Sequence, residues 1–385
     1  MRRNATKKGM DMENAVIYPF DKKVVPFIRY WNAQAKSPKI MSVVATENNG
    51  LLGRDIGELR NQDKLGIQIH TDLIEELSKY DTLVIIDVLN EQEGMYDKVR
   101  DSIETALCLQ KNVMCMYCLM QKDMDRFYEL AEEKHVTFEY YVSKKITSEI
   151  EYIPFELYRP RASVIMIGEM FPDLGGNEIA LGVNEFLKGK GYSTVVISEQ
   201  KWSVLDEIVP YPDFLKNISF REDQKVYYLN NYIRYLESQR KIDAIIMIIP
   251  DAMLKYSNQI CSRFGLIPFM ISQAVCADYF VFCTQYEILE EKFYNMMNLL
   301  FKYRYGFEID SIHMSNTMID LKGYTETARL SFLNMDIKDV SKVIEDHYKN
   351  NAIPVLNCTQ KKDFEFLCEN LLNKLIGYGD IQCVV

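Results

Sequence analysis

The stretch of this sequence best suited to chemistry is a glycine-rich loop over residues 168–178. It follows an expected buried strand, Ser163–Gly168, and opens an expected helix from Glu178 to Lys190. Gly175 and Gly176 let the backbone approach a ligand closely, and the free N–H groups of a helix N-terminus attract anions. Ligands of open parallel sheets bind beyond the carboxyl ends of the strands. The candidate ligand-binding residues of this loop are Gly168, Asp173, Gly175, Gly176, Asn177 and Glu178.

The placement is that of a phosphate-binding P-loop, but the residues do not match one. Aligning Gly176 with the last glycine of a P-loop puts Phe171 where the first glycine belongs. Asn177 then stands where a lysine should meet the phosphates, and Glu178 where a hydroxyl should bind magnesium. Because Asp173 adds further negative charge, we expect no active NTPase and a preference for a neutral or cationic group, such as a peptide. The alternative is a structural turn, in which Glu178 suits the helix dipole.

Two weaker candidates lie elsewhere in the chain. Asp251 follows the apolar run Ala244–Pro250, but an acid after a strand is common in any α/β protein and does not by itself indicate magnesium. Thr46 and Asn48 belong to residues 46–53, a polar run with two glycines. That run lacks the Gly-x-Gly-x-x-Gly spacing of a dinucleotide fingerprint, so a polar ligand loop and a plain Asn-Asn-Gly turn fit equally well.

The cysteines and histidines do not form a metal-binding pattern. Cys115 and Cys118 have the spacing of a redox or half-zinc motif, but no second cysteine pair or nearby histidine completes four ligands. On an expected strand these two side chains face opposite ways, so we expect both to pack in apolar surroundings without metal. Among the scattered histidines only His313, on an expected strand over 312–319, is a candidate for chemistry, with a structural role as the alternative.

The segment from Arg221 to Arg240 is expected to be a helix rich in tyrosine. Its apolar residues recur at helical spacing and predict a core stripe. Its tyrosines are at positions 227, 228, 232 and 235. Tyrosine-rich surfaces favour peptide contacts, although with 25 tyrosines in the chain the enrichment is also explained by composition alone.

These candidates are positioned by two successive cycles of strands and helices. In the first cycle we expect strands at 15–18, 40–46, 82–87, 113–117 and 136–142, with helices near 22–35, 70–79, 93–110 and 121–134. In the second we expect strands at 163–168, 194–198, 244–249, 268–272, 279–283, 312–319 and 354–357, with helices at 178–190, 221–240, 286–303, 337–348 and 361–376.

Strands that are apolar on both faces and separated by helices predict parallel sheets covered on both sides. The fold class is therefore α/β, with two tandem Rossmann-like doubly wound domains, the second carrying a degenerate P-loop-like turn. We expect a flexible tail over residues 1–13, an N-terminal domain over 14–156 and a C-terminal domain over 160–385.

Composition restricts the classes of partner. The 385 residues include 55 Asp and Glu against 45 Lys and Arg, a formal charge of -10, which disfavours nucleic acid. Nine unevenly spaced cysteines in mostly apolar runs suit a reducing cytosol. The longest apolar runs are strand-length, far short of the roughly 20 residues that cross a bilayer. We expect a cytoplasmic protein without a membrane partner.

Several stretches together resemble a known family. They are Ala15–Phe20, Val164–Met170, Asn177–Leu181, Gly191–Ser198 and Asp243–Pro250. In these the sequence resembles the clostridial peptide maturation system proteins, which are accessory proteins found beside radical SAM enzymes and Cys-rich, bacteriocin-like precursor peptides. The likeness covers nearly the whole chain through short motifs, and the family offers no catalytic residues to carry over.

The resemblance implies an accessory protein in the maturation of a ribosomally made peptide natural product. Such a protein would act by binding, with the precursor peptide or the radical SAM maturation enzyme as its partner. The alternative is a nucleotide-dependent enzyme or activator with a degenerate P-loop or Rossmann site. The residues indicate no particular cofactor.

Overall fold

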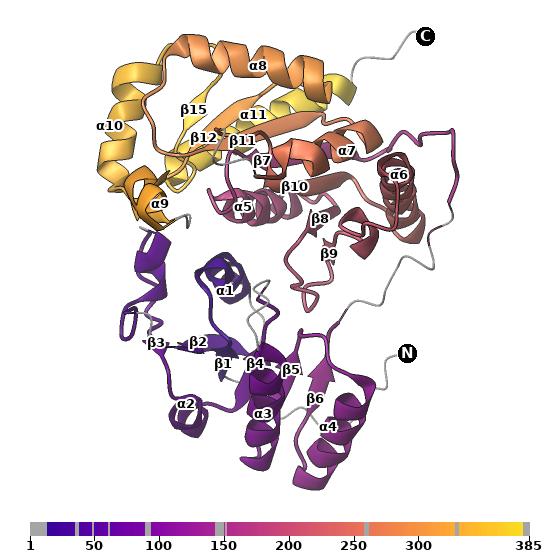
Figure 1. The fold of residues 1–385 in the computed structure, drawn as a ribbon, viewed down its shortest axis with the longest axis vertical. Helices are drawn as coiled ribbons and strands as arrows, with labels where there is room; N and C mark the ends of the chain where they lie inside the picture. The colour runs from indigo at the N-terminus through magenta and orange to yellow at the C-terminus, as the bar shows by residue number, and fades with distance from the viewer. Residues whose placement is uncertain are drawn as a thin grey trace. The chain divides into compact units, whose positions relative to one another are not determined.

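The structure is a computed structural model, and its chain divides into two compact units (Figure 1). It describes residues 14–34, 38–47, 50–60, 62–88, 94–142, 150, 152–257, 262–327 and 331–379. Residues 1–143 and 200–205 form the first unit, and residues 144–199 and 206–385 form the second. Each unit contains one parallel sheet with helices interleaved between its strands, so the α/β class with tandem Rossmann-like domains is confirmed.

The division falls earlier in the chain than the expected link near residues 157–159. The expected link and the segment before it already pack on a helix of the second unit. The Asn230 side chain accepts a hydrogen bond from Tyr158 N–H (2.7 Å) and donates one to Tyr158 O (2.8 Å). The Asn231 amide donates to Ile153 O at 3.4 Å. These polar side chains tie the segment to the second unit, and their partners could not be identified from spacing.

The first unit has the strand order of a Rossmann fold. Its elements are β1 (Asn14–Tyr18), α1 (Val25–Ala33), β2 (Lys39–Val44), β3 (Ile69–His70), α2 (Leu73–Lys79), β4 (Thr82–Ile85), α3 (Met95–Cys108), β5 (Asn112–Cys115), α4 (Gln121–Lys134) and β6 (Phe138–Tyr140). All neighbouring strands are parallel, in the order β3-β2-β1-β4-β5-β6. Right-handed crossovers place α1 on one face and α2, α3 and α4 on the other.

The second unit is built around a central strand, β7 (Ser163–Glu169). Its other strands are β8 (Thr194–Ser198), β9 (Ile208–Pro210), β10 (Ala244–Ala252), β11 (Tyr279–Thr284), β12 (Ser311–Met314), β13 (Thr317–Ile319), β14 (Phe332–Asn334) and β15 (Val355–Leu356). Its helices are α5 (Gly176–Gly189), α6 (Glu222–Gln239), α7 (Leu266–Ala274), α8 (Glu291–Tyr305), α9 (Leu321–Thr327), α10 (Ile337–Tyr348) and α11 (Lys361–Gly379).

The topology of this second sheet makes β7 a switch point. The main sheet is parallel, in the order β15-β12-β11-β7-β10-β8-β9, while β13 and β14 form a separate antiparallel pair. From β7 the chain runs through α5 to β8 on one side, and from β10 it crosses through α7 to β11 on the other. Because crossovers between parallel strands are right-handed, α5 and α7 lie on opposite faces of the sheet. Ligands of such sheets bind at the carboxyl ends of the strands beside the switch point.

The strand expected at residues 268–272 is wrong, because this run lies inside helix α7. Gly265 precedes the helix in the left-handed region at φ +67° and serves as its N-cap. Pro268 lies in the first helical turn, where its missing N–H costs no hydrogen bond. Ile267, Met270 and Ile271 are buried while Phe269 is 40% exposed, which is the burial of one helix face.

The remaining differences concern short elements. The strand expected over 312–319 is two strands, because Ser315 and Asn316 leave the main sheet after β12 and the chain then pairs with β14. Strands β3, β9 and β14 have two or three residues each and were not predicted. Strands of this length are too short for an alternation of apolar and polar residues to be recognised in the sequence.

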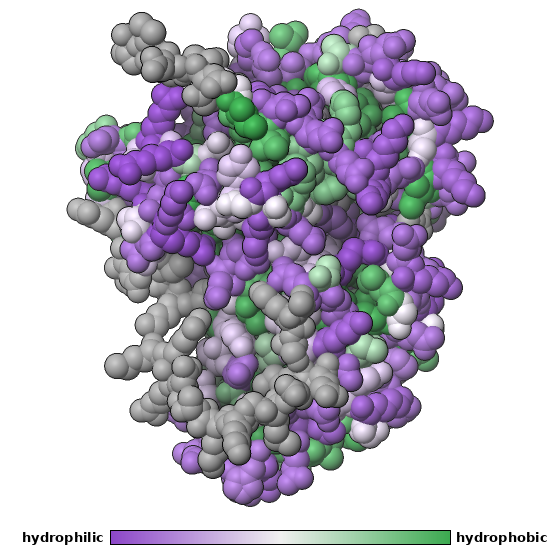
Figure 2. Space-filling view, turned by 180° about the vertical axis from the view of Figure 1, so that it is seen from behind, coloured by the Kyte–Doolittle hydropathy of each residue, from purple (hydrophilic) through white to green (hydrophobic). Residues whose placement is uncertain are grey.

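No helix in the described part of the chain is long and apolar enough to cross a membrane. On the face shown in Figure 2, hydrophilic side chains cover most of the surface, and hydrophobic ones gather in small separate patches.

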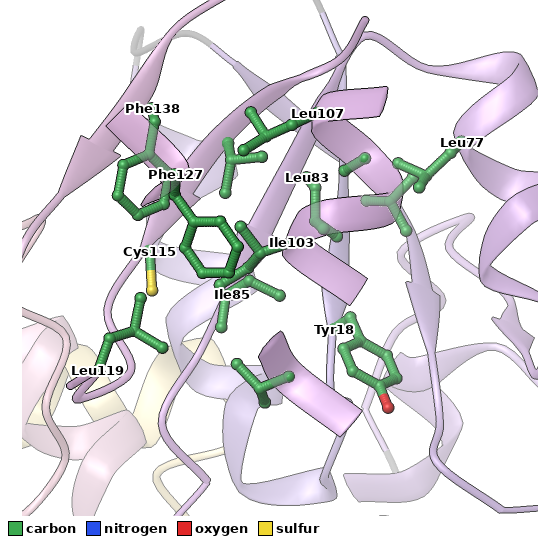
Figure 3. Close-up of a cluster of buried hydrophobic side chains, with 14 of the residues drawn as sticks. Tyr18, Leu77, Leu83, Ile85, Ile103, Leu107, Cys115, Leu119, Phe127 and Phe138 are labelled. Atoms are coloured by element: carbon green, nitrogen blue, oxygen red, sulfur yellow. The ribbon is translucent and has the colours of Figure 1, made fainter. Parts of the chain in front are cut away.

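The core of the first unit corrects part of the cysteine prediction. Cys115 ends β5 and packs among Ile85, Leu119 and Phe127, as Figure 3 shows. Its side chain is fully buried, and burial raises the pKa of the Cys115 thiol to about 12. Cys118 is different: it lies beyond the end of β5 and is exposed. The two cysteines therefore do not share a strand, and only Cys115 has the expected apolar surroundings.

Candidate functional site

The glycine loop lies where the sequence placed it, between the carboxyl end of the central strand β7 and the N-terminus of α5. Strand β7 is flanked by β11 and β10, which are both parallel to it. The loop thus occupies the switch-point position at which open α/β sheets bind ligands. It is also the position of the phosphate loop in a P-loop fold.

The centre of the loop is filled by a side chain of the protein itself, the Glu169 carboxylate. One oxygen, Oε1, accepts hydrogen bonds from Leu174 N–H (2.9 Å) and Gly176 N–H (2.8 Å). The other, Oε2, accepts one from Asp173 N–H at 2.9 Å. Glu169 is the last residue of β7 and only 8% exposed. Backbone N–H groups arranged in this way form an anion-binding concavity, and here they bind an internal carboxylate.

The two glycines of the loop are required by this arrangement. A Cβ added at Gly176 would lie 2.9 Å from Glu169 Oε1, so a side chain there would displace the carboxylate. Gly175 has φ +108°, a backbone conformation that residues with a side chain rarely adopt. A Cβ at Gly175 would also lie 2.9 Å from His313 Nε2. The glycines therefore serve close packing of the loop on Glu169 and His313.

The surroundings of Glu169 perturb its ionisation. Burial raises the pKa of the Glu169 carboxyl to about 7, and the negative charges of Asp173 and Glu178 act in the same direction. The hydrogen bonds from Gly176 and Asp173 N–H oppose this rise, because they stabilise the carboxylate. The loop therefore holds a buried acid that titrates near neutral pH.

His313, the one histidine singled out from the sequence, packs against the same loop. It lies on β12, is 1% exposed, and its Nδ1 accepts a hydrogen bond from Cys358 N–H at 3.1 Å. With Nδ1 as acceptor, the proton of the neutral ring belongs on Nε2, the atom that faces Gly175. Burial lowers the pKa of His313 to about 4, so the ring is neutral at pH 7.

The remaining predicted residues of the loop are Gly168, Asn177 and Glu178. A Cβ at Gly168 would lie 2.6 Å from Sδ of Met253, the residue after β10, and 3.0 Å from the Phe280 ring, so these side chains leave little room at Gly168. Asn177 and Glu178 lie in the first turn of α5. Asn177 Oδ1 is buried and accepts no hydrogen bond from the described residues. No lysine stands among these positions to meet a phosphate.

Asp251 reaches the same edge of the second sheet. It lies near the end of β10, in the left-handed region at φ +61°, just before Ala252. Ala252 is the strand partner of Glu169. The structure thus places Asp251 on the strand beside the loop, as expected for an acid at the end of that strand.

The weaker candidates of the first half lie in a different unit. Thr46 follows β2 in the first unit and is partly buried, whereas Asn48 lies outside the described residues. At the carboxyl end of β4 the first unit holds an ion pair instead: Lys201 Nζ donates to Asp87 Oδ2 at 2.8 Å. Lys201 belongs to the segment 200–205, which groups with the first unit. Its pairing with Asp87 was not foreseen, because the two residues lie 114 positions apart.

No metal centre is visible among the described residues, where no three His, Cys, Asp or Glu side chains are grouped as ligands. The functional role that sequence reasoning missed is that of Glu169. The signal was present, since an acid that directly follows a buried apolar strand and precedes a glycine loop must find hydrogen-bond donors. Which donors it finds depends on how the loop folds back.

Comparison with known proteins gives the fold only. A crystal structure of a DUF1611 family protein from Anabaena variabilis superposes on 94% of this chain and 99% of its own, with a TM-score of 0.57 and 11% sequence identity. At this identity the likeness concerns architecture, and it extends over both units. No protein-family model matches the sequence, and no curated protein matches it.

Proposed function

We propose that this chain is a cytoplasmic accessory protein in the maturation of a ribosomally synthesised peptide, and that it acts by binding the precursor peptide or its radical SAM enzyme. The proposal that the protein acts by binding is supported by the Glu169 carboxylate. It accepts hydrogen bonds from three backbone N–H groups at the position where a P-loop binds phosphates. A protein that fills this position internally is poorly suited to nucleotide hydrolysis. The peptide context comes from the family resemblance of the sequence.

The charges of the loop favour the same conclusion. A triphosphate would have to displace Glu169 and would then face Asp173 and Glu178, with Asn177 in place of the lysine. Like charges a few ångströms apart cost on the order of 1–4 kcal/mol each near a protein surface. The attraction of a helix N-terminus for an anion is smaller, about 1 kcal/mol or less. Repulsion should therefore exceed attraction.

An aromatic surface on the second unit is suited to a peptide. It consists of Tyr152, Phe155, Phe220, Tyr227 and Tyr228 around the first turns of α6. The rings contact one another in a row, with centroids 4.6 Å apart for Tyr152 and Tyr228 and 6.3 Å apart for Phe155 and Tyr227. Phe155 is 92% exposed. The other four rings are half-buried. Aromatic side chains provide large contact area at low entropic cost.

Calorimetric titration tests this function. The purified protein is titrated with ATP and GTP in magnesium and, separately, with a precursor peptide encoded beside its gene. We expect peptide binding and no nucleotide binding, and at least a tenfold loss of peptide affinity in a Tyr227→Ser, Tyr228→Ser double variant. Tyr303→Ser is the matched control, because Tyr303 is 83% exposed on α8, outside the aromatic surface.

The second candidate is a nucleotide-dependent enzyme or activator, and the strand orders of the two sheets favour it. The first unit has the order of a dinucleotide-binding fold, and the second places a glycine loop after its central strand. Micromolar ATP affinity that is lost in Gly176→Val, with turnover to the diphosphate, would establish this candidate and refute the accessory function.

A further inference from the structure

The two carboxylate oxygens of Glu169 accept different numbers of hydrogen bonds from the loop. Oε1 accepts two backbone hydrogen bonds, from Leu174 and Gly176, while Oε2 accepts one, from Asp173, among the described residues. A proton on the carboxyl group therefore belongs on Oε2, where the fewest donors compete with it. A protonated Oε2 is a hydroxyl oxygen, which accepts a weaker hydrogen bond than a carboxylate oxygen does, so the bond from Asp173 N–H weakens more than the two at Oε1.

The loop segment that Oε2 holds has an unusual backbone. Asp173 has φ +78°, a left-handed conformation that is uncommon for a residue with a side chain. Such conformations persist where surrounding contacts fix them. The hydrogen bond from Asp173 N–H to the Glu169 carboxylate is one such contact. Weakening this bond loosens a restraint on the one non-glycine residue between 169 and 178 that has a left-handed backbone.

Charged and titratable groups lie on each element that neighbours Glu169. The loop and α5 contribute Asp173 and Glu178, whose charges oppose ionisation of Glu169. Strand β11 contributes Cys283, the strand partner of Glu169, and β12 contributes His313, which lies against Gly175. Strand β10 contributes Asp251, next to the strand partner Ala252. Burial, Asp173 and Glu178 together raise the pKa of the Glu169 carboxyl to about 7.

We propose that Glu169 is a pH-sensitive latch of the loop over residues 169–178. As a carboxylate it holds Asp173, Leu174 and Gly176 N–H together in a closed loop. On protonation its bond to Asp173 N–H weakens, so the loop loosens at Asp173 while Leu174 and Gly176 stay bound. This proposal goes beyond the proposed function, because it does not depend on which partner the protein binds.

Nuclear magnetic resonance tests the latch directly on the unmodified chain. The protein is labelled with ¹³C at the glutamate carboxyl carbons, and the Glu169 signal is followed from pH 4.5 to 9. We expect a titration midpoint between pH 6 and 8. Amide hydrogen exchange, corrected for the intrinsic rate at each pH, should show the protection of Asp173 N–H falling at least tenfold between pH 8.5 and 5.5, with Leu174 and Gly176 changing less.

Two variants separate the latch from general effects of pH. Glu169→Gln mimics the protonated acid, so its Asp173 N–H should be weakly protected at both pH values. Glu185→Gln is the control, because Glu185 is an exposed acid on the same helix, and it should behave as the unmodified chain. A Glu169 midpoint below 5 or above 8.5, or equal Asp173 protection at both pH values, would overturn the proposal, and both readouts remain available should Glu169→Gln fail to fold.

Discussion

Replacing Glu169 by glutamine should change how the stability of the second unit depends on pH. Glutamine keeps the size of the side chain and an oxygen for Leu174 and Gly176 N–H, but it cannot ionise. In the unmodified chain the pKa of Glu169 is raised from 4.5 to about 7 by burial. A carboxyl whose pKa is raised on folding stabilises the folded state below pH 4.5, and this contribution is lost as the pH rises through about 7.

The size of this effect follows from the pKa. A rise from 4.5 to about 7 corresponds to about 3 kcal/mol, since one pKa unit is about 1.4 kcal/mol. Between pH 4.5 and 7.5 the unmodified chain should therefore lose about 3 kcal/mol of stability relative to Glu169→Gln. In terms of the folding equilibrium this is a relative change of roughly a hundredfold.

His313 acts in the opposite direction and must be separated from Glu169. Its pKa is lowered from 6.5 to about 4 by burial, so the unfolded chain binds more protons between these values. The stability from His313 is therefore fully present above pH 6.5 and is lost as the pH falls toward 4. Between pH 4.5 and 6.5 the two groups oppose each other in the unmodified chain, whereas Glu169→Gln keeps the contribution of His313 and lacks that of Glu169.

Urea unfolding from pH 4.5 to 8 measures the difference. The chain has two tryptophans, Trp31 and Trp202, and both belong to the first unit, so fluorescence follows that unit while far-UV circular dichroism follows both. Multi-domain chains often unfold in more than one step, which makes this separation necessary. Parallel stability curves for the unmodified chain and Glu169→Gln over this range would refute the reasoning, because Glu169 would then have the same pKa in the folded and unfolded states.

Two further perturbations should have specific outcomes. Gly176→Ala should destabilise the second unit by about 1–3 kcal/mol in urea unfolding, because its Cβ would lie 2.9 Å from Glu169 Oε1. Gly189→Ala, at the other end of α5, meets nothing within 4 Å and should be neutral or stabilising; equal losses in both variants would show that the carboxylate contact is unimportant. Thiol labelling followed by mass spectrometry should modify exposed Cys108, Cys118 and Cys276 in the folded protein and leave Cys115 unmodified, because burial raises the pKa of that thiol. Fast labelling of Cys115, or stoichiometric zinc that disappears in Cys115→Ser, would contradict its place in the core.

Most of the fold could be predicted because its strands are apolar on both faces. Strand β7 and strand β10 are continuous runs of buried residues between helices, and such runs indicate a parallel sheet. The same rule failed at residues 266–274, where an equally apolar run forms α7. Composition alone does not separate a buried strand from a buried helix of this length. Gly265 and Pro268 were the local signals for a helix start.

The position of the candidate site could be predicted from the sequence, but the contacts of Glu169 and His313 within it could not. The switch-point rule selects the loop after β7 from the strand order, and the substitutions at Phe171, Asn177 and Glu178 exclude an ordinary P-loop. That Glu169 turns back to accept three hydrogen bonds from its own loop depends on backbone angles, such as φ +78° at Asp173, which the sequence does not specify. The contact of His313 with Gly175 joins residues 138 positions apart and needs the folded sheet.

Titration of the purified protein with ATP in magnesium tests the central claim most directly, namely that Glu169 already occupies the phosphate position of the loop. The titration is made calorimetrically at pH 8, where Glu169 is ionised, on the unmodified chain and on Gly176→Val. We predict no binding of ATP to either protein at concentrations up to about a millimolar. Micromolar binding to the unmodified chain that is abolished in Gly176→Val would contradict the claim, because the triphosphate would then occupy the N–H groups assigned to Glu169.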